Sequence, residues 1–423
     1  MRHSSRVATV NQTPDVIVVG GGVIGCAVAF ELTRRSVRVL LLDKSLPGRA
    51  TSASAGGLWP VGEAVGLGCG VIYHAVRTSG GTKQVAGPEP LPEPFRDFLV
   101  QSNARFPALA RELRELADLD IEYAPGAGLL FVIYNEAERA FVECVRRSLP
   151  AGTHLEILSP EETARVEPRL TRDLLGAAAL AEEHQVNPML LAEAFKRAAL
   201  TRGALFRADC RVTALRQRGD RVVGVEIGEE FLPCRTVVNA AGSWAGKLAA
   251  TVGLEVPVIP VRGQIVLTET LPHTLNACLS TSACYLAQKA HGEVLIGSTT
   301  EHAGFDTAVT PEAIASLCRG AVRAVPLLRR VGVKRTWAGL RPGTPDELPI
   351  LGPVAGLDGY VNAAGGFRTG IVAAPLTGEV VAQVVNGETP SCPLEPFSVD
   401  RFSRSERADH VHTASSDPRP ARG

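Results

Sequence analysis

Residues 15–25 read Asp15-Val16-Ile17-Val18-Val19-Gly20-Gly21-Gly22-Val23-Ile24-Gly25, and residues 37–43 read Val37-Arg38-Val39-Leu40-Leu41-Leu42-Asp43. A short apolar strand leads into glycines with G-x-G-x-x-G spacing, an apolar helical pattern follows, and a second apolar strand ends on a carboxylate. This full order, rather than the glycines alone, is typical of a βαβ unit that binds a dinucleotide. We therefore expect a nucleotide cofactor near the start of the chain.

Each part of this unit has its own physical role. Gly20 lets the chain turn off its strand, Gly22 lets the backbone approach a pyrophosphate, and Gly25 lets the helix pack closely on the sheet. The start of the helix offers free N–H groups to the phosphates. Asp43, about 20 residues further on, can accept hydrogen bonds from both hydroxyls of an adenosine ribose, which disfavours NADP.

The composition is typical of a globular protein with two domains. The chain has 423 residues, which is longer than a domain with a single hydrophobic core usually is, so we expect two domains. Its 44 basic and 44 acidic residues cancel, so no net charge attracts nucleic acid. No run reaches about 18 apolar residues, which argues against a membrane-spanning helix. Residues 1–14 lack the apolar core of a secretory signal, so we expect a cytoplasmic protein.

The cysteines do not follow a metal-binding or disulfide pattern. The chain has 9 of them, an odd number, with no C-x-x-C pair and no histidine cluster nearby. We therefore expect no metal and no iron–sulfur cluster. Cys278 and Cys284 have no basic neighbour that would clearly depress a thiol pKa, which predicts unreactive thiols.

Later segments predict a second structural unit. Residues 95–119 have amphipathic helical spacing, residues 188–201 have helix composition after a proline start, and residues 256–300 are rich in strand-forming runs. We expect the second domain to begin near residue 95 and to supply a sheet that forms the wall of a substrate cavity. Residues 403–423 are polar and cannot bury enough apolar surface to order alone.

Three further segments complete the layout of a flavoprotein. They are Thr51-Ser52-Ala53-Ser54-Ala55-Gly56-Gly57, Trp337-Ala338-Gly339-Leu340-Arg341-Pro342-Gly343-Thr344-Pro345-Asp346 and Ala364-Gly365-Gly366-Phe367-Arg368-Thr369-Gly370-Ile371. With the N-terminal glycines, they resemble the FAD-dependent D-amino-acid oxidase superfamily, particularly its glycine oxidase branch. The resemblance implies an FAD that runs from the first glycines to the start of a C-terminal helix.

Longer strings resemble the third, flavin-bearing subunit of bacterial hydrogen cyanide synthases. These strings are residues 54–59, 65–72, 184–188, 296–301, 334–343 and 346–353, and the resemblance extends over roughly residues 15 to 400. It implies oxidation of glycine to cyanide and carbon dioxide together with partner subunits that take up the electrons. It also implies attachment to the cytoplasmic membrane through those subunits.

The same resemblance implies an α/β and α+β fold. A Rossmann-type FAD-binding domain would accompany a discontinuous substrate domain with a mixed antiparallel sheet, as in D-amino-acid oxidase. The FAD-binding domain is expected at residues 14–88, 155–253 and 336–400, the substrate domain at 89–154 and 254–335, and a disordered tail at 401–423.

The site residues follow from the matching motifs. Arg341 matches the arginine that holds the substrate carboxylate, and Tyr285 and Arg368 match positions that line the same small pocket, so these three are the expected catalytic residues. Family members often have histidine or another polar residue at the position of Gly366, which implies a roomier pocket here. The residues expected to contact FAD are Gly20, Gly22, Val23, Ile24, Gly25, Asp43, Lys44, Thr51, Ala55, Gly56, Gly57, Val212, Gly242, Gly366, Arg368, Thr369, Gly370 and Ile371.

The chemistry of these residues is compatible with amino-acid oxidation. A guanidinium pairs bidentately with a carboxylate, so Arg341 can orient an amino acid with its α-hydrogen toward the flavin. The hydride chemistry belongs to the flavin, and no dedicated general base is needed if the amine binds neutral. Helix N–H groups near Gly370 would stabilise negative charge on the reduced ring.

Other roles fit several of these residues. Arg341 could cap a helix or bridge the domains, and Tyr285 could be a half-buried core residue. His184, beside Asn187 and Pro188, fits a cap or turn better than a catalytic base. Two further functions are compatible with the motifs: oxidation of another small amine, such as a D-amino acid, an opine or hydroxyproline, and a non-catalytic subunit that only holds the flavin.

Overall fold

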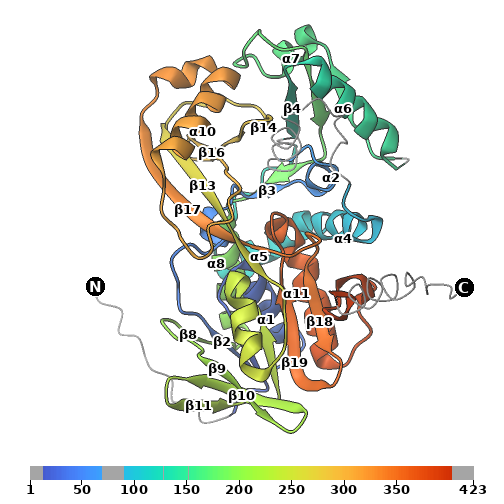
Figure 1. Ribbon diagram of the computed structural model, residues 1–423, viewed down its shortest axis with the longest axis vertical. Coiled ribbons are helices and arrows are strands. Elements are labelled where there is room, and N and C mark those ends of the chain that lie inside the picture. Colours follow the sequence, from blue (N-terminus) through green and yellow to red (C-terminus); the bar gives the residue numbers. More distant parts are fainter. Residues whose placement is uncertain (1–12, 69–89, 127, 151, 403–423) are drawn as a thin grey trace, which may run out of the picture.

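The computed structural model describes residues 13–68, 90–126, 128–150 and 152–402 and contains two large sheets stacked along the long axis (Figure 1). The first sheet has the strand order β11-β10-β19-β12-β1-β2-β8, with β18 beside β19 and β9 beside β10. Its strands are β1 (Val16–Val19), β2 (Val39–Leu42), β8 (Leu205–Arg207), β9 (Ala214–Arg218), β10 (Arg221–Ile227), β11 (Glu230–Pro233), β12 (Thr236–Asn239), β18 (Ile350–Val354) and β19 (Leu357–Ala364).

The centre of the first sheet confirms the predicted βαβ unit. β1 pairs in parallel with β2 and, on its other edge, with β12. All residues of β1 and β2 are buried, as expected for parallel strands covered on both faces. Helix α1 (Val23–Arg34) connects them and begins directly after the glycines.

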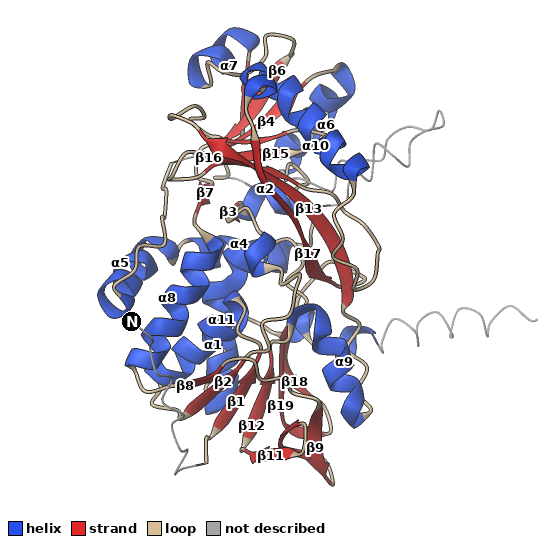
Figure 2. Ribbon diagram, turned by 90° about the vertical axis from the view of Figure 1, so that its left-hand side faces the viewer, coloured by secondary structure: helices blue, strands red, loops and turns tan. Residues whose placement is uncertain are grey.

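Helices cover one face of this sheet (Figure 2). α1 packs between α8 (Pro188–Thr201) and α11 (Gly370–Asn386), and α4 (Glu93–Asn103) and α5 (Phe106–Ala117) extend the layer. A Cβ at Gly378 of α11 would lie 2.9 Å from the backbone of Ala27, so this glycine allows close contact between α1 and α11. The expected helical segment at 95–119 is thus two helices, divided near Ala104.

The second sheet has the order β17-β13-β16-β15-β14-β4-β6-β5 and confirms the mixed sheet expected from the sequence. Its strands are β4 (Leu129–Ile133), β5 (Glu156–Leu158), β6 (Gly176–Leu180), β13 (Ile259–Thr270), β14 (Cys278–Ser280), β15 (Tyr285–Gln288), β16 (Glu293–Gly297) and β17 (Val333–Gly343), and its helices are α6 (Glu136–Ser148), α7 (Pro160–Val166) and α10 (Pro311–Ala324). The long strands β13 and β17 run from this sheet toward the first one (Figure 2).

A small connecting layer lies between the sheets. It contains the two-stranded pair of β3 (Gly57–Leu58) and β7 (His184–Gln185) and the short helix α2 (Pro60–Ala64). On the far side of the first sheet lies α9 (Ala245–Ala249) (Figure 2). These short elements place loop residues opposite the carboxyl ends of the parallel strands.

Sheet membership differs from the expected domain boundaries at one place. Residues 156–180 contribute β5 and β6 to the second sheet, although the sequence assigns residues 155–253 to the FAD-binding domain. β6 reads Gly-Ala-Ala-Ala-Leu and carries no β-branched residue, so its strand character comes from pairing with β4 and β5. The division into two domains stays a prediction.

Several predictions concern the surface and the termini. Among the described residues, none of the helices has the length and apolarity needed to cross a bilayer. The expected tail lies outside the described residues from 403 onward, as do residues 1–12 of the N-terminal segment and residues 69–72 of the string 65–72. Burial raises the pKa of the Cys278 thiol to about 11, and Cys284 is also buried.

Candidate functional site

A cavity of about 450 Å³ lies between the carboxyl ends of the parallel strands of the first sheet and the strands β15 and β17 of the second. Ligands of open α/β sheets bind at this edge, because the loops and helix starts there leave a crevice. The cavity extends from the glycines after β1 to the start of α11, as the resemblance implies for FAD.

The nucleotide end is formed by the glycine-rich turn. Gly20, Gly22, Val23 and Ile24 line the cavity. Gly20 has φ +113°, and a Cβ there would lie 2.2 Å from the carbonyl oxygen of Ala240. This turn therefore leaves the start of α1 beside the cavity, where backbone N–H groups beyond that of Val23 can bind phosphate oxygens.

Gly25 lies behind the cavity wall rather than on it. A Cβ at Gly25 would lie 1.8 Å from the carbonyl oxygen of Gly20, so this glycine allows the helix to pack against its own turn. It does not line the cavity, which supports the packing role expected from its spacing, and its contact with FAD stays a prediction.

Asp43 directly follows β2 and lines the cavity, and Lys44 lines the cavity beside it. The Oδ2 atom of Asp43 accepts hydrogen bonds from Nη1 of Arg49 at 2.9 Å and from Oγ of Ser45 at 3.1 Å. Arg49 also lines the cavity. The Arg49 contact orients the carboxylate that is expected to bind ribose.

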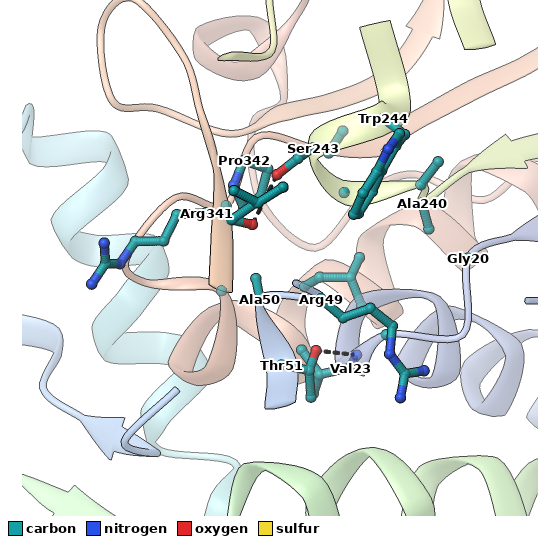
Figure 3. A pocket seen from close by; sticks show the side chains of 18 of the residues that line it. Gly20, Val23, Arg49, Ala50, Thr51, Ala240, Ser243, Trp244, Arg341 and Pro342 are labelled. Carbon is teal, nitrogen blue, oxygen red and sulfur yellow. Dashed lines mark hydrogen bonds between the residues drawn. The ribbon is translucent and has the colours of Figure 1, made fainter. Parts of the chain in front are cut away.

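The segment after Arg49 lies beside the glycine-rich turn and contacts the start of α1 through Thr51. The backbone N–H of Val23 donates to Oγ1 of Thr51 at 3.1 Å, and Figure 3 shows this bond with the two arginines, Arg49 and Arg341, extending toward opposite sides. The indole N–H of Trp337 donates to the carbonyl oxygen of Ser52 at 3.0 Å. The segment is therefore fixed both to α1 and to β17.

Ala55 and Gly57 line the cavity, but Gly56 does not. Gly56 has φ +79°, and a Cβ there would lie 2.0 Å from the carbonyl oxygen of Val186. Its role in the fold is close approach to the β7 segment, because β3 and β7 pair at this point. The contact of Gly56 with FAD stays a prediction.

The remaining cofactor positions come from three distant segments. Val212 lines the cavity between β8 and β9, Gly242 lines it shortly after β12, and Gly366, Gly370 and Ile371 line it at the start of α11. Thr369 does not line it: its hydroxyl donates to the carbonyl oxygen of Gly366 at 3.1 Å and its side chain is buried in the turn. The hydroxyl is thus used within the turn, and the contact of Thr369 with FAD stays a prediction.

Arg341 and Tyr285 meet at the opposite end of the cavity. Nη1 of Arg341 donates to the carbonyl oxygen of Thr299 at 3.1 Å, and Nη2 donates to Oγ of Ser298. A Cβ at Gly263 of β13 would lie 2.4 to 2.6 Å from the guanidinium, so the group lies directly against that strand. Its orientation is therefore set by backbone on two sides.

Tyr285 is held by aromatic and backbone contacts. Its ring meets that of Trp59 edge-on, with centroids 5.9 Å apart. A Cβ at Gly297 would lie 2.4 Å from the Tyr285 hydroxyl, so only a glycine leaves room there. Tyr285 is 7% exposed and lines the cavity, which places it as a core residue and a wall residue at once.

Arg368 also lines this end of the cavity, but its charge is partly shared. Nη2 donates to Oε2 of Glu347 at 2.7 Å, and Nε lies 3.7 Å from Oε2 of Glu63. The guanidinium carbon lies 5.1 Å from the centroid of the Phe367 ring. Arg368 is thus an ion-paired wall residue.

Glu63 is the acidic residue in this wall that sequence reasoning missed. It lies in α2, one helical turn beyond Trp59, and is 8% exposed. Burial raises the pKa of its carboxyl, while Arg368 and Arg341 act in the opposite direction. The only sequence signal was a carboxylate shortly after the small-residue segment. Other lining residues that were missed are Arg49, Trp59, Ser243, Trp244 and Ser298.

His184 does not line the cavity. Its Nδ1 atom accepts a hydrogen bond from the N–H of Gly126 at 3.1 Å, and burial lowers the pKa of its imidazole. The cap of α8 is Asn187, whose side-chain oxygen accepts from the N–H groups of Met189 and Leu190. The role of His184 is therefore structural, because its side chain joins β7 to the backbone at Gly126.

The donors along the cavity fit FAD. The start of α1 lies at one end, the carboxylate of Asp43 directly follows the second strand, and the start of α11 lies at the other end. Among the described residues there is no group of three or more His, Cys, Asp or Glu suited to a metal ion.

Comparisons with known proteins agree with this geometry. Residues 15–384 match the family described as FAD dependent oxidoreductase. The hydrogen cyanide synthase subunit HcnC of Pseudomonas aeruginosa is 45% identical over 405 residues, which cover 93% of this chain and 97% of that protein. Glycine oxidase of Geobacillus kaustophilus is 33% identical over 393 residues, 92% of this chain and 97% of that protein.

The solved structures give the same result. The crystal structure of glycine oxidase from Geobacillus kaustophilus has a TM-score of 0.79 at 32% identity and covers 92% of this chain and 99% of that one. Iminodiacetate oxidase from Chelativorans has a TM-score of 0.77 at 25% identity, with coverage of 90% and 98%. This chain belongs to the FAD-dependent oxidoreductase family and takes FAD as its cofactor.

Proposed function

We propose that this chain oxidises glycine as the FAD-bearing subunit of a cyanide-forming enzyme. The observation that carries the proposal is the guanidinium of Arg341, held against β13 at the end of the cavity where Tyr285 and Trp59 form a compact wall. The identity of 45% to a hydrogen cyanide synthase subunit over almost the whole chain supports the same reaction.

Arg341 binds the substrate carboxylate in this proposal. A guanidinium offers two parallel N–H groups to a carboxylate, and its fixed orientation limits the directions from which the acid can approach. The α-carbon is then held in one position, and positioning of this kind supplies a large part of catalysis. Tyr285 and Trp59 restrict the space next to the α-carbon.

FAD supplies the electron acceptor for the α-hydrogen, which leaves as a hydride. The N–H groups at the start of α11 stabilise negative charge at the adjacent part of the cavity, because no side chain at Gly366 or Gly370 covers them. A first oxidation gives the imine of glycine, and a second, coupled to loss of carbon dioxide, gives cyanide. Each oxidation removes two electrons.

Partner subunits take up these electrons. The relative with 45% identity is named a subunit, which supports a heteromeric assembly for this chain as well. Association with the cytoplasmic membrane, where it occurs, goes through those partners.

The test is anaerobic mixing of the purified flavoprotein with a panel of small amino acids. Glycine should bleach the oxidised flavin, and co-expression with candidate partner subunits should release cyanide from glycine. Bleaching by other amines but not by glycine would reject the proposal.

A second candidate is oxidation of a larger N-substituted glycine. The absence of a side chain at Gly366 favours it, since this position borders the cavity, and a solved neighbour at 25% identity is an iminodiacetate oxidase. The same panel separates the candidates if it includes iminodiacetate. A flavin-holding subunit without its own chemistry would keep full turnover in the complex after Arg341→Ala.

A further inference from the structure

We propose that Glu63 receives the ammonium end of the substrate and accepts its proton, which makes the substrate of this site a zwitterionic amino acid bound at both ends. This inference rests on the proposed function and deepens it. It assigns a catalytic residue that the motifs did not contain.

The first support is the position of the carboxylate. Glu63 lines the same end of the cavity as Arg341 and Tyr285, and its side chain is almost completely buried. A Cβ at Gly68 would lie 2.3 to 2.6 Å from the Glu63 carboxylate, so the group is packed against that backbone.

The second support is an unused acceptor atom. Within the described residues, Oε2 of Glu63 has no hydrogen-bond partner, and neither has Nε of Arg368. These two atoms lie 3.7 Å apart, which is too long for a hydrogen bond. A buried carboxylate oxygen that accepts no hydrogen bond is costly even beside an ion-pair partner such as Arg368, and an ammonium group in the cavity would supply the missing donor.

The third support is the charge balance around the substrate. Among the described residues, the charged groups that act on Glu63 include the cations Arg368 and Arg341 and the acids Glu347 and Glu183. Two guanidiniums suit a carboxylate but repel an ammonium group. Glu63 is the carboxylate on the cavity wall at this end, so it can offset that repulsion where the amine must lie.

The proton moves from the substrate ammonium to Glu63. An N–H bond of the ammonium breaks, an O–H bond forms on Oε2 of Glu63, and the electron pair stays on nitrogen. That pair becomes the second C=N bond when the Cα hydrogen leaves with its two electrons to FAD. Because burial raises the pKa of Glu63, the carboxyl is a better proton acceptor than an exposed glutamate.

The test compares Glu63→Gln with Glu347→Gln. Both variants remove one acidic partner of Arg368, but Glu347 does not line the cavity. The measurement is the second-order rate constant for anaerobic flavin reduction by glycine, determined as a function of pH. In the wild type the rate should rise with pH through the raised pKa of Glu63 and then stay high, since the carboxylate is the active form.

In Glu63→Gln the rate at pH 7 should fall by about 100-fold or more, and its rise should move to the pKa of the free amine of glycine. Glu347→Gln should keep the pH dependence of the wild type. Equal pH profiles for the wild type and Glu63→Gln, or a uniform loss at every pH, would overturn the inference.

A binding measurement distinguishes loss of the proton acceptor in Glu63→Gln from structural damage to the site. Acetate has the carboxylate of glycine without the amine, and its binding can be followed by the change in the absorbance of oxidised flavin. Glu63→Gln should bind acetate at least as tightly as the wild type, because a negative charge is removed, and should bind glycine more weakly at pH 7. Loss of acetate binding as well would assign Glu63 a structural role.

Failure of the two proposals is distinguishable. If wild-type flavin is not reduced by glycine but is reduced by another amino acid, the proposed function fails and the same comparison is made with that amino acid. If glycine reduces the wild type and Glu63→Gln equally, the proposed function stands and the role of Glu63 fails.

Discussion

Val23 donates its backbone N–H to the hydroxyl of Thr51 at 3.1 Å, and this bond joins the first turn of α1 to the segment that crosses the cavity. A Cβ at Gly22 would lie 3.3 Å from the same hydroxyl oxygen. The glycine-rich turn and the segment around Thr51 are therefore joined directly, although 28 residues separate Val23 from Thr51.

Thr51→Val should weaken FAD binding. The change keeps the shape of the side chain but leaves the Val23 N–H without its acceptor, at a cost of about 1–3 kcal/mol. Titration of the apoprotein with FAD, followed by flavin fluorescence, measures the change. Thr201→Val, at an exposed position of α8, is the control and should leave FAD affinity unchanged. Equal FAD affinity for the wild type and Thr51→Val would show that the hydrogen bond between Val23 and Thr51 does not contribute to FAD binding.

Gly20→Ala should prevent stable folding or FAD retention. The new methyl would meet the carbonyl oxygen of Ala240 at 2.2 Å in a backbone conformation with φ +113°, and the clash and strain together cost several kcal/mol, with about 1–3 from overpacking alone. Thermal unfolding measures the effect. Gly219→Ala is the matched control, because its φ is also positive, at +60°, but nothing lies within 4 Å of the new Cβ. A similar loss in both variants would show that backbone strain, not the contact with Ala240, is responsible.

Arg341→Lys should raise the glycine concentration needed for flavin reduction by about 10- to 100-fold. Lysine keeps the charge but lacks the planar pair of donors, and a hydrogen bond to a charged group contributes about 1.5–3 kcal/mol. Anaerobic stopped-flow reduction measures the shift. Arg335→Lys is the control on the same strand, since Arg335 is exposed and does not line the cavity. An unchanged concentration dependence in Arg341→Lys would assign Arg341 to domain bridging.

Glu183→Gln should alter the pH dependence of stability. Glu183 accepts the N–H groups of Val61 and Gly62 at the start of α2, and its burial raises the pKa of its carboxyl well above the usual value. The folded state then holds a proton that the unfolded state releases, so this group makes the fold less stable as pH rises from the usual glutamate pKa through the raised one.

The stability of the wild type relative to Glu183→Gln should therefore fall as pH rises across that range. Urea unfolding at several pH values measures the difference. A difference that grows with pH would show that the charged form of Glu183, through its two backbone donors, is the favoured one.

The local pattern of residues 15–43 was enough to predict β1, α1 and β2, because strand, tight turn and helix depend on neighbouring residues only. The family resemblance extended this to the cofactor and to Arg341, Tyr285 and Arg368, all of which line the cavity. Gly25, Gly56 and Thr369 belong to the same motifs but do not line the cavity, and their contact with FAD stays a prediction.

The amino-acid order thus established a nucleotide-binding unit, its cofactor class and the guanidinium at the far end. Only the folded chain decided that Glu63, Arg49 and Ser298 join that site and that β5 and β6 complete the second sheet. The physical reason is distance along the chain. A glycine turn is specified by its own few residues, whereas the burial of a carboxylate and its neighbouring charges depend on segments hundreds of residues apart that meet after folding.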